Sequence, residues 1–468
     1  TQTTEIATAE APRLASFDAR LKQLGPAPQA KDDEPAPVES EAVKTERDEQ
    51  LRLQAESQGR VKQAQLLALR AEEIIKTIGD RRRDRFTREL VERSRSVLDP
   101  SMWFEALQSM PGTANGLRYL IGDWMSLLAS RGVETSIAVG SVIVALSALL
   151  FGLRRRLVII ADRDPDVVDP PVLRKAAVAA GIVVLNLVIP LGCLIGAAWA
   201  LETFDLARDR VLQFLGAVTA GVGAAAAIYS VALALFAPAK PHWRLVAIDD
   251  ATATRIVGLS VVLSVTHGLG VAIGRLMGVL AAPVAEVIAV SGLFVVIDAV
   301  VVMAALRATA RAFTILEAGA DGVEGPRRSI VWRWIVPLGW VVVIAAVVAA
   351  IVGYVALGSF LTTQLVRTGF FLGALYILLL LVDELSLATF HERTRFGVLL
   401  TRSMGFGRET VEQIGVVLSG VARLFLIAAT ALLILTPIGV DSQDVVSDAR
   451  LAFFGFKIGG FTFSLATI

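Results

Sequence analysis

Eight stretches of about 20 apolar residues constrain the fold of this chain more than any other feature. They lie at about 133–152, 176–200, 211–236, 256–274, 284–306, 335–357, 362–382 and 411–437. Each is long enough to cross a hydrocarbon core about 30 Å thick as an α-helix. The chain is 54% hydrophobic and 19% charged, with a mean hydropathy of +0.63, which is more apolar than a soluble domain. The sequence therefore predicts an all-α polytopic membrane protein with eight spans at 133–437.

Basic residues gather in alternate connections between these stretches. They lie at 153–156 and 174–175, at 240–255, at 307–333 and at 393–408. The intervening connections carry few basic residues, namely Arg208 and Arg210, then Arg275, then none, then Arg450. Because cytoplasmic loops carry the excess of Lys and Arg, the N-terminal arm and residues 438–456 are expected outside. In a bacterial cell this places the protein in the inner membrane with its arm in the periplasm.

The first 132 residues are polar and are expected to form a helical domain. Within this arm, 24–40 is rich in Pro, Ala and acidic residues and is expected to be a linker. A coiled-coil-like stripe follows at Leu53, Ser57, Ala64, Leu67, Ala71, Ile74 and Ile78. Gly79 interrupts the stripe, so 41–95 is either one bent helix or a helical hairpin. Residues 1–97 are expected to form an autonomous unit.

A second helix is expected to start near the first span, where Asp99 can cap it and Pro100 suits its first turn. Three aromatic residues follow at Trp103, Tyr119 and Trp124. Their rings either rest at the membrane interface or pack against the helices of the arm.

Ionisable side chains within spans are costly and are therefore the candidate functional residues. They are His267, Asp298, Arg367 and Arg423. His267 and Asp298 could relay protons in a transporter. A buried pair that fixes helix register, or an arginine that reaches to the lipid headgroups, is the alternative that we prefer.

Small residues at four-residue spacing predict close helix packing. Gly270, Gly274 and Gly278 form one such ladder on the fourth span, and 221–227 form another on the third. The single cysteine, Cys193, excludes an intrachain disulfide and a cysteine-based metal site. The basic run 81–83 has flanking acidic residues and indicates a solvated helix face, so no nucleic-acid partner is expected. No enzyme motif occurs, and neither catalysis nor a cofactor is expected.

The segment "LTPIGVDSQDVVSDARLAFFGFKIGGFTFSLATI" (435–468) resembles the region just ahead of the channel module in large members of the small-conductance mechanosensitive channel family. The arm, with "LGPAP", "RRRDRFTRELVERS" and "LDPSMW", resembles a periplasmic domain found in a subset of these channels. The resemblance implies a homo-oligomer, commonly of seven subunits, that contacts membrane lipids and releases ions and osmolytes on hypo-osmotic shock.

In that family the segment corresponding to 438–468 is a periplasmic loop that leads into the next span. The resemblance implies that 457–468 begins a ninth span and that the conducting helix lies beyond Ile468, so no pore residue can be assigned. Two other functions remain open. One is a secondary transporter that uses Asp298, and the other is a non-conducting scaffold whose arm binds envelope partners.

The alternation of basic connections generates a topology prediction. Reporter fusions after Leu153, Pro241 and Gly322 should report the cytoplasm, because these connections carry the basic residues. Fusions after Leu201 and Asp441 should report the periplasm. Paired phosphatase and fluorescent reporters measure this directly, and a periplasmic signal at Gly322 would overturn the predicted topology.

Overall fold

The computed structural model describes residues 2–25, 40–160, 163, 170–238, 240–246, 248–318, 330–390, 408–436, 456–458 and 461–463. The chain divides into two compact units, Thr1–Phe86 and Thr87–Ile468. The expected arm of residues 1–132 is therefore split, and the helix that follows Asp99 belongs to the second unit. The autonomous unit that we expected to end at residue 97 ends instead at Phe86.

The first unit pairs α1 (Gln2–Leu24) with the beginning of α2 (Glu41–Val91). The two helices run antiparallel. Arg20 donates to Glu46 over 2.6 Å, and Arg60 lies 3.6 Å from Glu10. The expected linker at 24–40 lies mostly outside the described residues. α2 continues through Gly79 as one helix, which resolves the choice between a bent helix and a hairpin in favour of a single helix.

The coiled-coil-like stripe is only partly covered. Ser57 and Ala64 are buried, whereas Leu67 and Ile74 are more than half exposed. Burial thus follows the part of α2 that α1 reaches, since Glu10 near the start of α1 lies beside Arg60.

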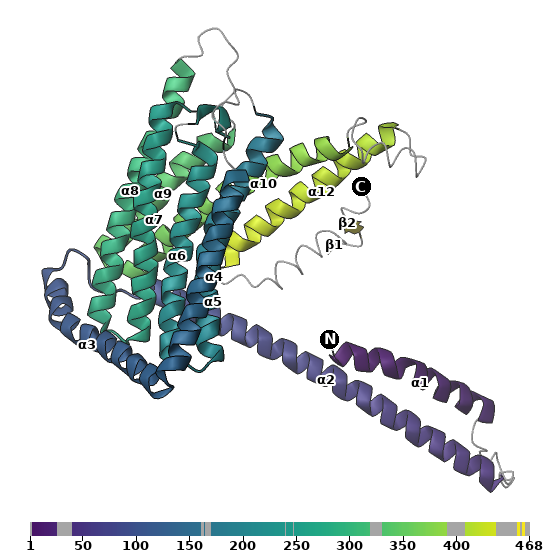
Figure 1. The fold of residues 1–468 in the computed structure, drawn as a ribbon. Helices are drawn as coiled ribbons and strands as arrows, with labels where there is room; N and C mark the ends of the chain where they lie inside the picture. Colours follow the sequence, from purple (N-terminus) through teal and green to yellow (C-terminus); the bar gives the residue numbers. More distant parts are fainter. Residues whose placement is uncertain are drawn as a thin grey trace. The chain divides into compact units, whose positions relative to one another are not determined.

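The described part of the second unit contains eight helices that are long and apolar enough to cross a membrane (Figure 1). They are α4 (Val133–Ile160), α5 (Val172–Thr203), α6 (Asp209–Phe236), α7 (Asp250–Val279), α8 (Val284–Ala318), α9 (Ile330–Val352), α10 (Val355–Phe390) and α12 (Arg408–Leu435). The chain is thus an all-α polytopic membrane protein, as the apolar stretches predict. A short 3-10 helix, η1 (Pro241–Trp243), lies between α6 and α7.

One boundary differs from the sequence prediction. The sixth span was expected to continue to residue 357, but α9 ends at Val352 and α10 begins at Val355. Gly353 forms the turn with φ +106°, a conformation that glycine adopts without steric cost. The apolar run continues through this turn, so hydropathy alone does not reveal it.

Residues 94–97 are held against the α9–α10 turn. The Ser94 backbone N–H donates to the Gly353 carbonyl over 2.8 Å, and the Val97 N–H donates to the Ala350 carbonyl over 3.3 Å. A Cβ atom at Gly353 would lie 2.5 Å from the Ser94 carbonyl oxygen. The chain therefore joins the membrane helices before α3 begins.

Helix α3 (Pro100–Ser130) begins as the sequence predicts. The Asp99 side chain accepts a hydrogen bond from the Ser101 backbone N–H over 2.9 Å, and Pro100 occupies the first turn. The Ser101 hydroxyl donates to the same oxygen over 2.7 Å, and this hydrogen bond, with the one from the backbone N–H, lowers the pKa of Asp99 because both donors stabilise the carboxylate. Met102 and Ala106 of α3 are fully buried against Ala289 of α8.

Helices α6 and α7 make the closest crossing among the described spans. A Cβ atom at Gly221 would lie 2.5 Å from the Gly268 carbonyl oxygen, and one at Gly268 would lie 2.8 Å from the Gly221 carbonyl oxygen. The ladder expected at 221–227 thus does meet a neighbouring helix. On α7 the close contact is made by Gly268 and not by the expected ladder.

The three ladder glycines of α7 have different surroundings. A Cβ atom at Gly270 would lie 3.0 Å from Phe294 of α8, whereas Gly274 and Gly278 have no atom within 4 Å. The four-residue spacing identifies a row of small residues. It does not say which side of the helix meets a neighbour, and Gly268, which approaches α6, lies about 200° around the helix from Gly270.

The expected ninth span is not seen in the described residues near the end of the chain. β1 (Phe456–Ile458) and β2 (Phe461–Phe463) pair antiparallel, with Ile458 opposite Phe461. The sequence explains this difference, because Gly459-Gly460 is a preferred dipeptide for a two-residue hairpin connection.

The crossing of α6 and α7 can be tested with two alanine substitutions on α7. Gly268→Ala should lower the free energy of unfolding by about 1–3 kcal/mol, because the methyl group overlaps the α6 backbone. Gly274→Ala, the matched control, should leave it unchanged or raise it slightly. Thermal unfolding of the detergent-purified protein measures both, and equal effects would contradict the assigned crossing.

Candidate intramembrane polar site

A buried histidine and aspartate meet between α7 and α8, about halfway along each helix. The His267 Nδ1 atom lies 2.8 Å from the Asp298 Oδ2 atom, and the two residues are 7% and 3% exposed. The Thr266 hydroxyl donates to the other carboxylate oxygen over 2.7 Å. The structure thus brings together the two residues that the sequence singles out, and it adds Thr266.

This arrangement fits a structural pair better than a relay. Both carboxylate oxygens of Asp298 have a partner, and His267 is enclosed by apolar helices. A buried carboxylate that lost its partners would cost several kcal/mol in hydrocarbon surroundings. The pair therefore fixes the rotation of α7 relative to α8.

The two candidate arginines have different surroundings. The Arg423 Nε atom of α12 donates to the Oδ1 atom of Asp383 on α10. The sequence analysis missed Asp383, because it ended the seventh span at residue 382 while α10 continues to Phe390. Arg367 lies on α10 with an exposed side chain. Neither arginine joins the His267–Asp298 pair.

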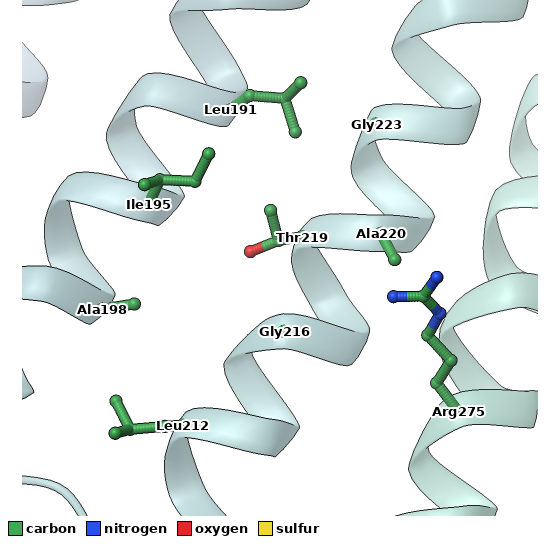
Figure 2. A pocket seen from close by; sticks show the side chains of 9 residues that line it. All are labelled: Leu191, Ile195, Ala198, Leu212, Gly216, Thr219, Ala220, Gly223 and Arg275. Carbon is green, nitrogen blue, oxygen red and sulfur yellow. The ribbon is translucent and has the colours of Figure 1, made fainter. Parts of the chain in front are cut away.

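A further arginine lies within a span where the sequence analysis placed a loop residue. Arg275 belongs to α7, which continues to Val279. Its side chain reaches beside Ala220 at the edge of a groove of about 460 Å³ (Figure 2). Apolar and small residues of α5 and α6 line the rest of this groove, namely Leu191, Ile195, Ala198, Leu212, Gly216, Thr219, Ala220 and Gly223. A guanidinium stays protonated, so it can attract an anion but cannot carry protons.

A second buried carboxylate lies where α8 begins. Glu286 is 3% exposed and accepts a hydrogen bond from the Thr113 hydroxyl of α3 over 2.6 Å. The Ser109 hydroxyl lies 3.5 Å from the same carboxylate oxygen. Among the ionisable residues expected within spans, Asp298 is the only carboxylate. Glu286 of α8 is a second buried one. Glu286 serves to attach α3 to α8.

A buried arginine binds the C-terminal end of α6. Arg163, from the connection between α4 and α5, donates to the carbonyls of Leu233 and Ala234 over 3.0 and 2.7 Å. These carbonyls belong to the last turn of α6, where a cation is favourable. Burial lowers the pKa of Arg163 to about 10, so the guanidinium remains charged at neutral pH.

The described residues offer no alternative metal chemistry. No group of three or more His, Cys, Asp or Glu side chains within them is close enough to hold a metal ion. Cys193 is a free, half-buried thiol on α5. The polar groups of the described residues can therefore hold helices together or attract an ion.

Comparison with known proteins finds a family match for one part of the chain. Residues 61–123 match a family described as "Protein of unknown function (DUF3772)". The match covers part of α2 and most of α3, and it includes the segments "RRRDRFTRELVERS" and "LDPSMW". No curated protein and no solved structure matches the chain.

The role of the buried pair can be tested by replacing Asp298 alone and by replacing Asp298 and His267 together. Asp298→Ala should destabilise the protein by roughly 3–5 kcal/mol, because His267 and Thr266 keep buried polar atoms without a partner. Asp298→Asn should cost less, since the amide oxygen can still accept from Thr266. The double variant His267→Leu/Asp298→Leu should recover much of the loss.

Yield and thermal unfolding of the purified variants measure these differences. Arg367→Gln is a matched control within a span, and it should have little effect because this side chain is exposed. Full stability of Asp298→Ala would contradict a structural role for the pair.

Proposed function

We propose that this chain is the tension-sensing part of a mechanosensitive channel subunit. In this proposal the eight spans face lipid around a homo-oligomeric ring, seven-membered by resemblance to the family. The ion pathway lies outside these spans. Opening releases ions and osmolytes from the cell on hypo-osmotic shock, and the first unit lies in the periplasm of an inner-membrane protein.

The observation that carries the proposal is the contrast between satisfied polar groups and exposed apolar helix faces. His267 and Asp298 are buried, and both carboxylate oxygens of Asp298 have a partner, so this site holds no carboxylate oxygen free to bind a solute. Helix α12 packs along α10 and exposes much of its remaining apolar surface. Its strongly exposed residues are Val416, Val417, Val421, Leu424 and Phe425.

Lipid-facing helices of this kind suit a response to membrane tension. Tension favours the state that occupies the larger membrane area, and a helix can change area by changing its tilt. Such a mechanism needs helix faces in contact with lipid and no bound substrate. The resemblance of residues 435–468 to the channel family is the second support.

Patch recording from membranes that hold the gene's product should show conductance steps whose open probability rises with suction. Val421→Asn on the exposed face of α12 should raise the threshold tension, because a polar side chain weakens contact with lipid. Leu66→Asn, at an exposed position on α2, is the control and should leave the threshold unchanged.

The same protein can be tested for transport. Proton-coupled solute uptake that is lost in Asp298→Asn, together with patches that stay silent under suction, would replace the channel proposal with the secondary transporter. An assembly without either activity would favour the scaffold.

A further inference from the structure

Helix α3 has three distinct sides. One side is buried against the membrane helices and includes Met102, Ala106 and the partly buried Trp124. A second side is polar and exposed, with Glu105, Gln108, Asn115, Asp123 and Ser126. The third side, called here the apolar flank, is formed by Phe104, Leu107, Ile121 and Met125, which are 65, 60, 48 and 59% exposed.

The flank residues lie along one side of the helix in two pairs, one near its start and one near its end. They are separated by steps of three, fourteen and four residues, each close to a whole number of helical turns. Arg118 lies on the same side, between Leu107 and Ile121, and is exposed. Four large apolar side chains and one long basic side chain thus form a single stripe beside the polar side.

The placement of α3 is fixed at one end of the span helices. Along its length it contacts the start of α8 through Glu286, the end of α7 through Leu280, and the α5–α6 connection through Leu206. The Trp124 indole N–H donates to the Leu206 carbonyl over 2.9 Å, and Arg208 pairs with Asp123 at 3.0 Å. Figure 1 shows α3 running across this end.

The depth of α3 can be read from its contacts. Ala289, which Met102 and Ala106 cover, lies five residues after the start of α8. At 1.5 Å per residue this is about 7 Å along the helix. Amphipathic helices that lie in the membrane plane bury their apolar side by roughly 5–10 Å. Measured from the start of α8, the buried side of α3 thus lies at a depth that such interfacial helices reach.

We propose that the apolar flank of α3 is a lipid-binding surface. It lies at the headgroup boundary of the outer leaflet, with Arg118 directed to lipid phosphates. The occupant is the phospholipid bilayer, because the spans that α3 contacts also expose apolar side chains at the end where α3 lies. Val284 at the start of α8 and Val133 and Ile137 at the start of α4 are 74, 65 and 64% exposed. A charged residue within the stripe also suits headgroups better than the apolar centre of a protein interface.

The three aromatic residues that the sequence places near the membrane do not belong to the flank. Trp103 and Trp124 donate their indole N–H groups to backbone carbonyls of Val97 and Leu206 and so pack within the protein. Tyr119 is 78% exposed and extends from the polar side. The inference concerns only the contact of α3 with lipid and holds whether the protein is a channel, a transporter or a scaffold.

Spin labels test the proposal on the full-length chain in liposomes. Single cysteines are introduced at Leu107, Ile121 and Met125 on the flank and at Gln108 and Ser126 on the polar side, in a Cys193→Ala background. Accessibility is then compared between oxygen, which concentrates in lipid, and a nickel chelate, which stays in water. Gln108 and Ser126 are matched controls, since each is the next residue after a flank position.

Labels on the flank should have an oxygen-to-nickel accessibility ratio several-fold higher than the two controls. Nickel accessibility at the flank equal to that of the controls would place the flank in water and overturn the proposal. Low accessibility to both reagents would show that protein, such as a second copy, covers the flank. High oxygen accessibility at all five positions would overturn the assigned boundary depth.

Discussion

The two neighbouring residues His267 and Gly268 give α7 its central place among the spans. Gly268 has no side chain, which lets the backbone of α6 approach to contact distance. His267, the residue before it, lies about 100° around the helix and bonds to Asp298 of α8. In hydrocarbon there is no hydrophobic force to press helices together, so packing contacts and internal hydrogen bonds must do so. Helix α7 uses one of each, on neighbouring sides, to hold α6 and α8.

The same principle extends to the ends of the spans. Arg163 satisfies carbonyls at one end of α6, and Glu286 binds hydroxyl groups of α3 at the start of α8. The Ser94 N–H and the Val97 N–H bond to carbonyls at the α9–α10 turn. Polar side chains and backbone N–H groups thus bond near the ends of the helices, and they tie the connecting segments to the spans.

The sequence predicts the spans well because length and hydropathy are local properties. It also identifies the cap at Asp99 and the two residues of the buried pair, since a cap and an intramembrane charge are recognisable one residue at a time. It cannot predict which side of a helix meets a neighbour. The ladder at Gly274 and Gly278 therefore misses the crossing at Gly268.

The predicted ends of some spans are wrong for a related reason. A turn at Gly353 within an apolar run leaves no trace in hydropathy, and a helix that continues one turn further moves Arg275 from a loop into a span. Near the end of the chain, an apolar run that suggests a ninth span instead forms two short strands. In each case the deciding information is a backbone conformation, which composition does not encode.

Some charged side chains in the spans are paired with one another, and others are exposed, and this difference bears on function. Transport of a solute or a proton requires groups that can change partners, as Asp and His do in relays. Here Asp298 and His267 hold one another, and Asp383 holds Arg423. Arg275 and Arg367 have exposed guanidinium groups that can attract headgroups or anions. In this membrane region the titratable groups thus hold helices together, and Arg275 and Arg367 remain exposed. Such a region is suited to respond to changes in the surrounding lipid. Helix α3 would extend the contact with lipid to the boundary of one leaflet.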